Sequence, residues 1–119
     1  KKVHKSLKAE RRIRFSTFEE LFVRKEKEFD FELKEAIEFV KNTKFGIEVD
    51  MDSIVHAPSS AQSNSGFHLN HLREMVYKAG SHKNVAYLHI CEGSPLHDDQ
   101  DRFQTGKAIS FLITDFIRK

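Results

Sequence analysis

The chain has 119 residues, 39% of them hydrophobic and 32% charged, which is typical of a single soluble globular domain. Its 20 lysines and arginines nearly balance 18 aspartates and glutamates, so the charge does not argue for nucleic acid or an anionic membrane as partner. The single cysteine excludes a disulfide framework. No apolar run has the length of a membrane span and no leader pattern opens the chain. We therefore expect a cytoplasmic protein.

The first fourteen residues are strongly basic, with a single acid at Glu10. The basic residues are Lys1, Lys2, Lys5, Lys8, Arg11, Arg12 and Arg14. We interpret residues 1–12 as a helical or disordered lead-in, with a solvated helix face favoured over a binding arm. Residues 13–18 alternate apolar and polar side chains, which predicts a short strand. Because the chain begins without methionine, inside this charged stretch, we expect a piece of a longer protein.

Apolar side chains at helical spacing predict three further helices. They lie at about residues 29–40, 69–79 and 109–116. Two apolar runs of strand length separate them, at residues 45–50 and 85–91. The second run is apolar on both faces apart from His89, which is typical of a strand in the middle of a parallel sheet. The alternation of strands and helices predicts an α/β fold, a parallel sheet with flanking helices formed by residues 1–119 as a single segment.

Both predicted strands end in carboxylates. Asp50 and Asp52 lie two residues apart at the end of the first, and Glu92 follows the second. The backbone turns away at a strand's carboxyl end, so such side chains can converge at the edge where open α/β sheets bind ligands. Two anionic oxygen donors suit a hard divalent metal ion. Asp50 and Asp52 are therefore candidate metal ligands, and the plainer alternative is that they cap a turn.

Other polar residues have structural interpretations. We expect His89 to be a buried histidine that is hydrogen-bonded across the sheet. Cys91, within an apolar strand, is expected to be a small buried residue. Asp98, Asp99 and Asp101 lack the spacing and glycine of a calcium loop. We expect this acidic loop to cap the last helix, with negative charge at the helix's positive end.

Three segments resemble the ureohydrolases, the family of arginase, agmatinase and formimidoylglutamase. Residues 46–54, Gly-Ile-Glu-Val-Asp-Met-Asp-Ser-Ile, resemble the family motif Ser-Phe-Asp-x-Asp-x-Leu-Asp-Pro. Residues 87–95 resemble a later strand of the family, which ends in Glu with Pro three residues on. Residues 65–67, Ser-Gly-Phe before a helix, resemble the family's Gly-Gly-Leu turn. The pattern is most similar to formimidoylglutamase-like members.

The resemblance implies the C-terminal portion of an arginase-like three-layer fold and a manganese site. In the family, the first Asp of the motif bridges two Mn²⁺ ions and the second binds one, roles that fall on Asp50 and Asp52. Glu92 matches the glutamate that pairs with the substrate's cationic nitrogens. His68 follows the glycine turn, where the family often has a polar residue near the substrate. Two metals held by shared carboxylates lower the pKa of a bridging water, giving a hydroxide that attacks the amidine carbon.

The sequence also departs from the family. Ile54-Val55-His56 replaces Leu-Asp-Pro, and His89 stands where many relatives have Asp. The family's other metal ligands, an upstream His and an Asp-x-His-x-x-x-Asp segment, are absent. We therefore expect half of a metal site, inactive alone and dependent on the missing N-terminal part of the fold. A truncated sheet of this kind is also expected to favour homo-oligomers.

The resemblance implies a small-molecule amidine or guanidine substrate. The expected reaction is the hydrolysis of N-formimidoyl-glutamate to glutamate and formamide, with arginase-type or agmatinase-type activity as an alternative. A further alternative is a non-catalytic α/β binding or assembly domain, in which Asp50 and Asp52 form a weak cation site. A phospho-receiver domain is not supported, because the chain lacks its lone acceptor Asp on a middle strand and its late Lys-Pro.

Overall fold

The computed structural model describes residues 12–58, 63–98 and 103–118. The chain divides into two compact units, Lys1–Val40 and Lys41–Lys119. The predicted lead-in at residues 1–12 lies outside the described residues except for Arg12. That the whole chain forms one α/β segment stays a prediction.

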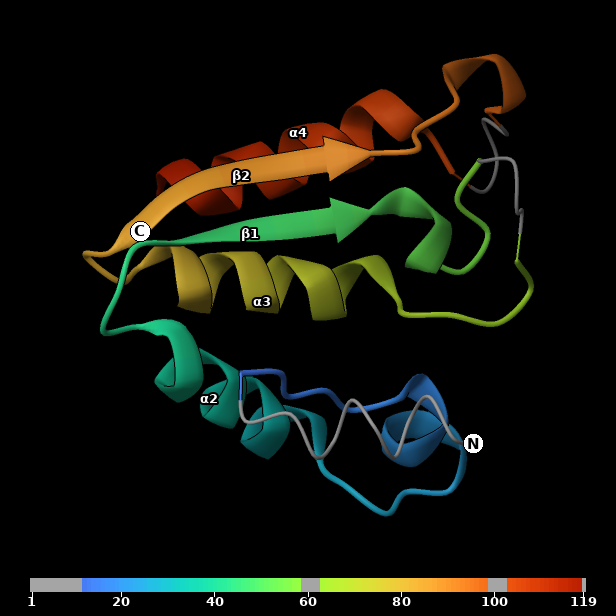
Figure 1. Ribbon diagram of the computed structural model, residues 1–119. Helices are drawn as coiled ribbons and strands as arrows, with labels where there is room; N and C mark the ends of the chain where they lie inside the picture. The colour runs from blue at the N-terminus through green and yellow to red at the C-terminus, as the bar shows by residue number, and fades with distance from the viewer. Residues whose placement is uncertain (1–11, 59–62, 99–102, 119) are drawn as a thin grey trace. The chain divides into compact units, whose positions relative to one another are not determined.

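The first unit contains a π-helical turn, Glu19–Val23, and helix α2, Phe29–Val40 (Figure 1). The helix predicted at residues 29–40 is thus confirmed, and Leu33 and Ile37 are its buried residues. The strand predicted at residues 13–18 is wrong, because this segment has no strand pairing and becomes helical at its last residue.

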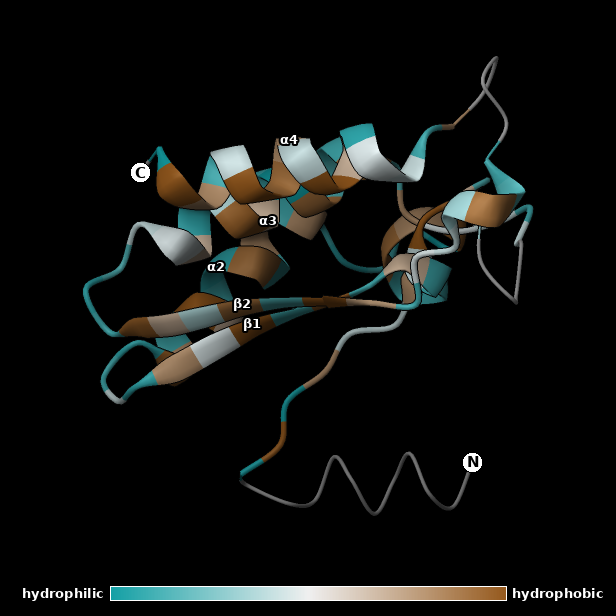
Figure 2. Ribbon diagram, turned by 90° about the horizontal axis from the view of Figure 1, so that it is seen from above, coloured by the Kyte–Doolittle hydropathy of each residue, from teal (hydrophilic) through white to brown (hydrophobic). Residues whose placement is uncertain are grey.

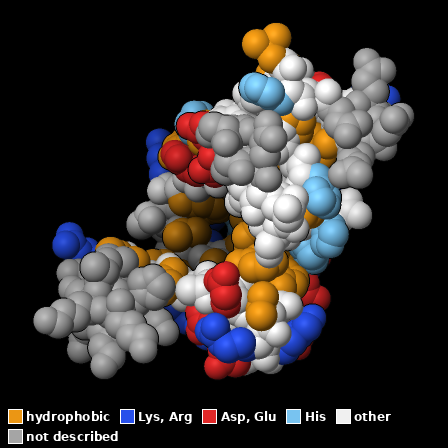
Figure 3. Space-filling model, turned by 90° about the vertical axis from the view of Figure 1, so that its right-hand side faces the viewer, with side chains coloured by type: hydrophobic (Ala, Val, Ile, Leu, Met, Phe, Trp, Pro, Cys, Tyr) orange, Lys and Arg blue, Asp and Glu red, His pale blue; other side chains and the backbone are white. Residues whose placement is uncertain are grey.

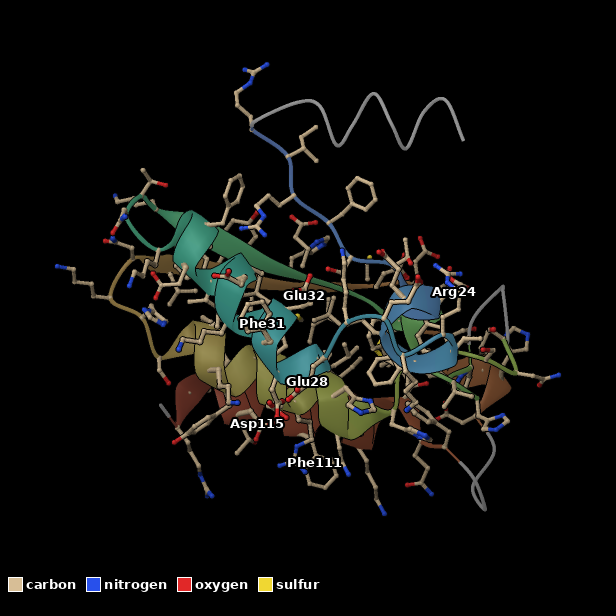
Figure 4. All side chains as sticks on the ribbon, turned by 90° about the horizontal axis from the view of Figure 1, so that it is seen from below. Arg24, Glu28, Phe31, Glu32, Phe111 and Asp115 are labelled. Atoms are coloured by element: carbon tan, nitrogen blue, oxygen red, sulfur yellow. The ribbon has the colours of Figure 1, made fainter. Side chains whose placement is uncertain are left out.

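A capping box explains why the extended segment ends there. The backbone N–H of Glu20 donates to Thr17 Oγ1 at 3.1 Å, and the Thr17 N–H donates to Glu20 Oε1 at 2.9 Å. Lys27 Nζ lies 3.2 Å from Glu20 Oε2 and 3.7 Å from Oε1 of Glu32, a residue of α2 that Figure 4 labels. Ser16 Oγ donates to Glu32 at 2.5 Å. These contacts join the turn, the loop and α2 within the first unit.

The second unit is a two-stranded parallel sheet with two helices. Its elements are β1 (Phe45–Asp50), α3 (Leu69–Gly80), β2 (Val85–Cys91) and α4 (Thr105–Ile117). The strands and helices predicted at these places are all confirmed. Both helices lie on the same face of the sheet, which is seen nearly edge-on in Figure 2.

The core of this unit lies between the sheet and the helices. Ile47 and Val49 of β1 are buried, as are Leu72 and Val76 of α3 and Leu112 of α4. The two helices are also joined at their outer surface. Arg73 forms a bidentate pair with Asp115 at 2.7 and 3.0 Å, and its guanidinium lies 4.2 Å from the Phe111 ring centroid; Figure 4 labels both α4 residues. One face of the sheet is therefore firmly covered.

The opposite face carries exposed polar side chains. Tyr87 and His89 of β2 are exposed, so the expectation of a strand buried on both faces is not met. Tyr87 Oη donates to Glu48 Oε1 at 3.0 Å, and His89 Nδ1 lies 3.6 Å from Glu48 Oε2. The expectation that His89 is buried is therefore wrong, although it does face a cross-strand partner. Cys91 is only partly buried. Tyr87, His89 and Cys91 are less buried than expected because α3 and α4 both pack on the same face of the sheet.

Candidate functional site at the carboxyl edge of the sheet

The end of β1 is a tightly bonded turn. Asp50 is the last strand residue, and its Oδ1 accepts a hydrogen bond of 2.8 Å from the Asp52 backbone N–H. Ser53 Oγ donates to the Asp50 carbonyl oxygen at 2.7 Å. Between them, the Met51 side chain is fully buried and anchors the turn. Asp50 therefore performs the capping role that was the plainer interpretation of this acid.

Asp52 is in a different state. Its Oδ1 is buried and has no hydrogen-bond partner among the described residues. A buried carboxylate oxygen without a donor costs free energy, so native structures seldom leave one without a partner or a role. The neighbouring Asp50 carboxylate is exposed and keeps lone pairs beyond the bond that it accepts. The turn therefore presents carboxylate oxygens that can bind a cation, and no described residue donates a hydrogen bond to Asp52 Oδ1.

The loop after β1 returns to this turn at Gly66. The Phe67 N–H donates to the Ser53 carbonyl at 2.8 Å, and the Val55 N–H donates to the Phe67 carbonyl at 2.8 Å. A Cβ atom at Gly66 would lie 2.6 Å from the Ser53 carbonyl oxygen, which is too close for any side chain. The glycine turn is therefore part of the scaffold that holds the Asp50–Ser53 segment.

The end of β2 places its acid differently. Glu92 is exposed and has a φ of 65°, in the left-handed region that a residue with a Cβ adopts only at a cost. Gly93 follows in close packing, since a Cβ there would lie 3.1 Å from Thr105 Cγ2 and 3.9 Å from Met51 Cγ. Gly93 thus lies close to Met51, which follows β1, as the pairing of the two strand ends requires.

The predicted carboxylates share one electrostatic environment. The strand register pairs Asp50 with Cys91, the residue just before Glu92. Burial raises the pKa of the Cys91 thiol, and nearby carboxylates raise it further. These are Asp50, Glu92, Glu48 and Asp52. Figure 3 views this edge end-on, from the side to which the strand arrows of Figure 1 point. Asp50, Asp52 and Glu92 thus each contribute to the electrostatic environment of the Cys91 thiol.

His68 lies in another part of this edge. It is the exposed N-cap residue of α3, and its backbone N–H donates to His71 Nδ1 at 3.3 Å. Its side chain lines an open pocket of about 630 Å³ together with His56 and Phe103. None of the three carboxylates lines this pocket. That His68 binds the substrate stays a prediction.

The donors at the strand ends fit a metal ion in kind but not in number. Carboxylate oxygens suit Mn²⁺ and Mg²⁺, and Asp50 and Asp52 supply such oxygens. Across residues 12–58, 63–98 and 103–118, however, no group of three or more His, Cys, Asp or Glu side chains is placed to hold a metal ion. The described residues therefore fit part of a metal site.

Asp98 caps the last helix, as expected. Its Oδ1 accepts hydrogen bonds from the Thr105 backbone N–H at 3.1 Å and from Thr105 Oγ1 at 2.5 Å. Asp99 and Asp101 lie outside the described residues.

Sequence reasoning missed the left-handed conformation of Glu92 and the bond between Tyr87 and Glu48. If the pairing of β1 with β2 had been known, the bond between Tyr87 and Glu48 could have been predicted. No described helix is long and apolar enough to cross a membrane.

Comparison with solved structures identifies the fold. The native arginase of Bacillus caldovelox at pH 5.6 matches 100% of this chain and 40% of its own, with a TM-score of 0.73 and 16% identity. An arginase from Bacillus subtilis subsp. subtilis strain 168 matches 80% of this chain and 34% of its own (TM-score 0.63, 19% identity). Another structure of Bacillus subtilis arginase matches 76% and 35% (TM-score 0.62, 19% identity). No family model and no curated protein matches the sequence. The chain has an arginase-like α/β fold and spans at most 40% of these arginases.

Proposed function

We propose that this chain is the C-terminal part of a ureohydrolase and carries half of its metal site. The observation that carries the proposal is the buried Asp52 Oδ1, which has no partner among the described residues. Asp52 comes two residues after Asp50, whose carboxylate is exposed, at the carboxyl edge of the sheet where α/β folds bind ligands. The arginase-like fold supports the same conclusion.

Asp50 and Asp52 would hold the metal, and upstream residues of the same fold would complete the site. Two Mn²⁺ ions, when bound, supply a water whose pKa is low enough to give hydroxide near neutral pH. The chain's own contribution is to position the donors. The Asp52 N–H fixes the Asp50 carboxylate, and the Gly66 turn braces Ser53.

Glu92 would bind the substrate. Its exposed carboxylate lies past the end of β2, at the same edge of the sheet as the end of β1, and a carboxylate orients a cationic amidine or guanidine through charge-assisted hydrogen bonds. The substrate we propose is N-formimidoyl-glutamate, cleaved to glutamate and formamide in the cytoplasm. His68 would contact it from the mouth of the neighbouring pocket. Arginase-type or agmatinase-type guanidine substrates are the alternative.

Calorimetric titration with Mn²⁺ tests the half-site. We expect weak binding to the 119-residue chain that disappears in the Asp50→Asn/Asp52→Asn double variant. Asp30→Asn is the matched control, because Asp30 is an exposed carboxylate in the first turn of α2, and its binding should equal that of the parent chain. Binding that survives in the double variant would contradict the proposed ligands. Tight stoichiometric binding lost in that variant would contradict the half-site by showing a whole one.

Product analysis tests the substrate. The chain would be joined to an upstream segment that supplies the missing ligands, and formamide and urea would both be assayed. Formamide release from N-formimidoyl-glutamate, lost in Glu92→Gln, is the expected result. Urea release from a guanidine would favour the arginase or agmatinase alternative.

A non-catalytic domain is the second candidate function. The observation that favours it is that Asp50 already caps its own turn and needs no metal to be useful. In this case Asp50 and Asp52 form only a weak cation site, so joining the upstream segment would not enlarge the rise in the thermal unfolding midpoint that Mn²⁺ causes by binding the folded state.

A further inference from the structure

We propose that Tyr87 and His89 hold the Glu48 carboxylate away from the metal ion and so act as positioning residues. The ion is thereby confined to Asp50 and Asp52 at the end of β1, and the inference rests on the proposed function for these two ligands. Glu48 and Asp50 lie two residues apart on β1 with exposed side chains, so they share the face of the sheet opposite α3 and α4. Their spacing along the strand is about 7 Å, within reach of one common cation.

Both carboxylate oxygens of Glu48 are engaged by side chains of β2. Tyr87 Oη donates to Oε1 at 3.0 Å, and His89, directly opposite in the register, has Nδ1 3.6 Å from Oε2. The hydrogen bond to Glu48 and the charge of that carboxylate raise the pKa of Tyr87. We call these two contacts the Glu48 clamp. Asp50 differs, because among the described residues it accepts a hydrogen bond at Oδ1 alone, from the Asp52 backbone N–H.

Gly46 provides the space that the clamp needs. It lies opposite Tyr87 in the strand register, and a Cβ atom at Gly46 would overlap the Tyr87 ring. The ring therefore lies directly over the glycine backbone. This brings the hydroxyl to Glu48, the next residue of β1 on the same face. The position of the hydroxyl is thus set by the strand pairing and by the absence of a side chain at residue 46.

A free Glu48 would alter the proposed site. The number of carboxylates sets the affinity for a hard divalent cation, so a third carboxylate beside Asp50 raises it. It also occupies a coordination position that upstream residues are proposed to fill. With Glu48 clamped, no group of three or more His, Cys, Asp or Glu side chains in the described part of the chain is placed to hold a metal ion. The clamp therefore keeps the cation at the strand end and leaves coordination positions open there.

Calorimetric titration of the 119-residue chain with Mn²⁺ tests the clamp. Tyr87→Phe/His89→Gln removes both contacts and keeps Glu48. We expect this variant to bind Mn²⁺ roughly tenfold more tightly than the parent chain, because a third carboxylate becomes available. Adding Glu48→Gln should return the affinity to the parent value. Tyr77→Phe/His82→Gln is the matched control, since it removes the same groups from α3 and the loop that follows, and it should bind as the parent does.

The outcomes separate this inference from the proposed function. An affinity that is unchanged in Tyr87→Phe/His89→Gln would overturn the inference, whether or not the parent chain binds Mn²⁺. A gain that survives the added Glu48→Gln would also overturn it, because another group would then be the new ligand. The proposed function fails through a different result, which is Mn²⁺ binding that survives in Asp50→Asn/Asp52→Asn.

Titration of the Tyr87 hydroxyl tests the clamp without metal. In a Tyr77→Phe background Tyr87 is the sole tyrosine, and its ultraviolet absorbance reports its ionisation. Glu48→Gln should lower the pKa of Tyr87 toward its ordinary value of 10.0, since the charge of the accepting carboxylate is gone. Gly46→Ala should do the same by displacing the ring. Circular dichroism checks that both variants are folded. A pKa of Tyr87 that stays equally raised in Glu48→Gln would overturn the clamp.

Discussion

The carboxyl ends of β1 and β2 both present acids, yet the two ends are built in different ways. At β1, Asp50 is bonded to its own turn, and Met51 is buried beneath it. At β2, Glu92 is exposed and its backbone is in the left-handed region. The hydrogen bond of the Asp50 cap stabilises the turn, which is sufficient reason for an acid there. A strained backbone lowers stability instead, and such strain is concentrated at functional sites. An acid that follows a strand can therefore be a structural cap or a candidate functional residue, and the backbone conformation distinguishes the two cases.

Glycine replacement should show the largest difference between the two ends. Gly66→Ala sets a Cβ 2.6 Å from the Ser53 carbonyl, and backbone cannot move aside as a side chain can. We expect a loss of about 1–3 kcal/mol in the free energy of unfolding by urea. Gly93→Ala meets Thr105 Cγ2 at 3.1 Å and should cost less. Gly106→Ala has no atom within 4 Å and serves as the control. Equal costs at residues 66 and 93 would break the comparison.

Removal of each acid should separate the cap from the other carboxylates. Asp50→Ala loses the bond from the Asp52 N–H and should lower the free energy of unfolding by about 1 kcal/mol. Asp52→Asn replaces a carboxylate that has a buried, unpartnered oxygen, so it should cost less than Asp50→Ala without metal. Chemical denaturation in a chelator measures both. Equal losses would mean that Asp52 has a structural role of its own.

Relief of strain should act in the opposite direction at β2. Glu92→Gly removes the Cβ that disfavours a φ of 65° and should raise the free energy of unfolding by about 0.5–1 kcal/mol. Lys25→Gly, at a φ of 57° in the first unit, is the matched control and should also stabilise. If only Lys25→Gly stabilises, contacts of the Glu92 side chain offset its strain, and the contrast with β1 is smaller than proposed.

Glu20 provides a reference for an acid that is held purely by structure, with the smallest expected effect. The Thr17 N–H, then Lys27 and the Thr17 hydroxyl, lower the pKa of Glu20 from 4.5 to about 2. A lowered pKa stabilises the folded state above the ordinary value, and this contribution is lost as the pH falls from about 4.5 toward 2. Acid titration of Glu20→Gln should show less destabilisation over this window than the parent chain. Glu28→Gln, an exposed control, should follow the parent chain.

The regular elements were predictable because they rest on hydrophobic periodicity. The buried residues Leu33 and Ile37 lie at helical spacing, and residues 45–50 and 85–91 are apolar runs of strand length. The strand prediction at residues 13–18 failed because two competing signals overlap there. Alternation suggests a strand, but Thr17 and Glu20 form a capping box that starts a helix.

Other features depend on information that spacing does not contain. The sequence of an apolar strand such as β2 does not reveal whether one face of the sheet or both are covered, because this depends on which elements pack against the strand. The expectation that Asp50, Asp52 and Glu92 converge came from strand order, and the parallel register that pairs Asp50 with Cys91 places the ends of both strands at one edge. The capping bond of Asp50 and the unpartnered oxygen of Asp52 did not come from strand order, because they depend on the backbone path through Met51.

The bond from Thr105 to Asp98 also affects how this protein could be altered. It fixes the first residue of α4 to the residue that follows the 3₁₀ turn Pro95–His97. A change at Asp98 would therefore act on a helix that covers the sheet, although Asp98 itself is exposed and lies outside that helix.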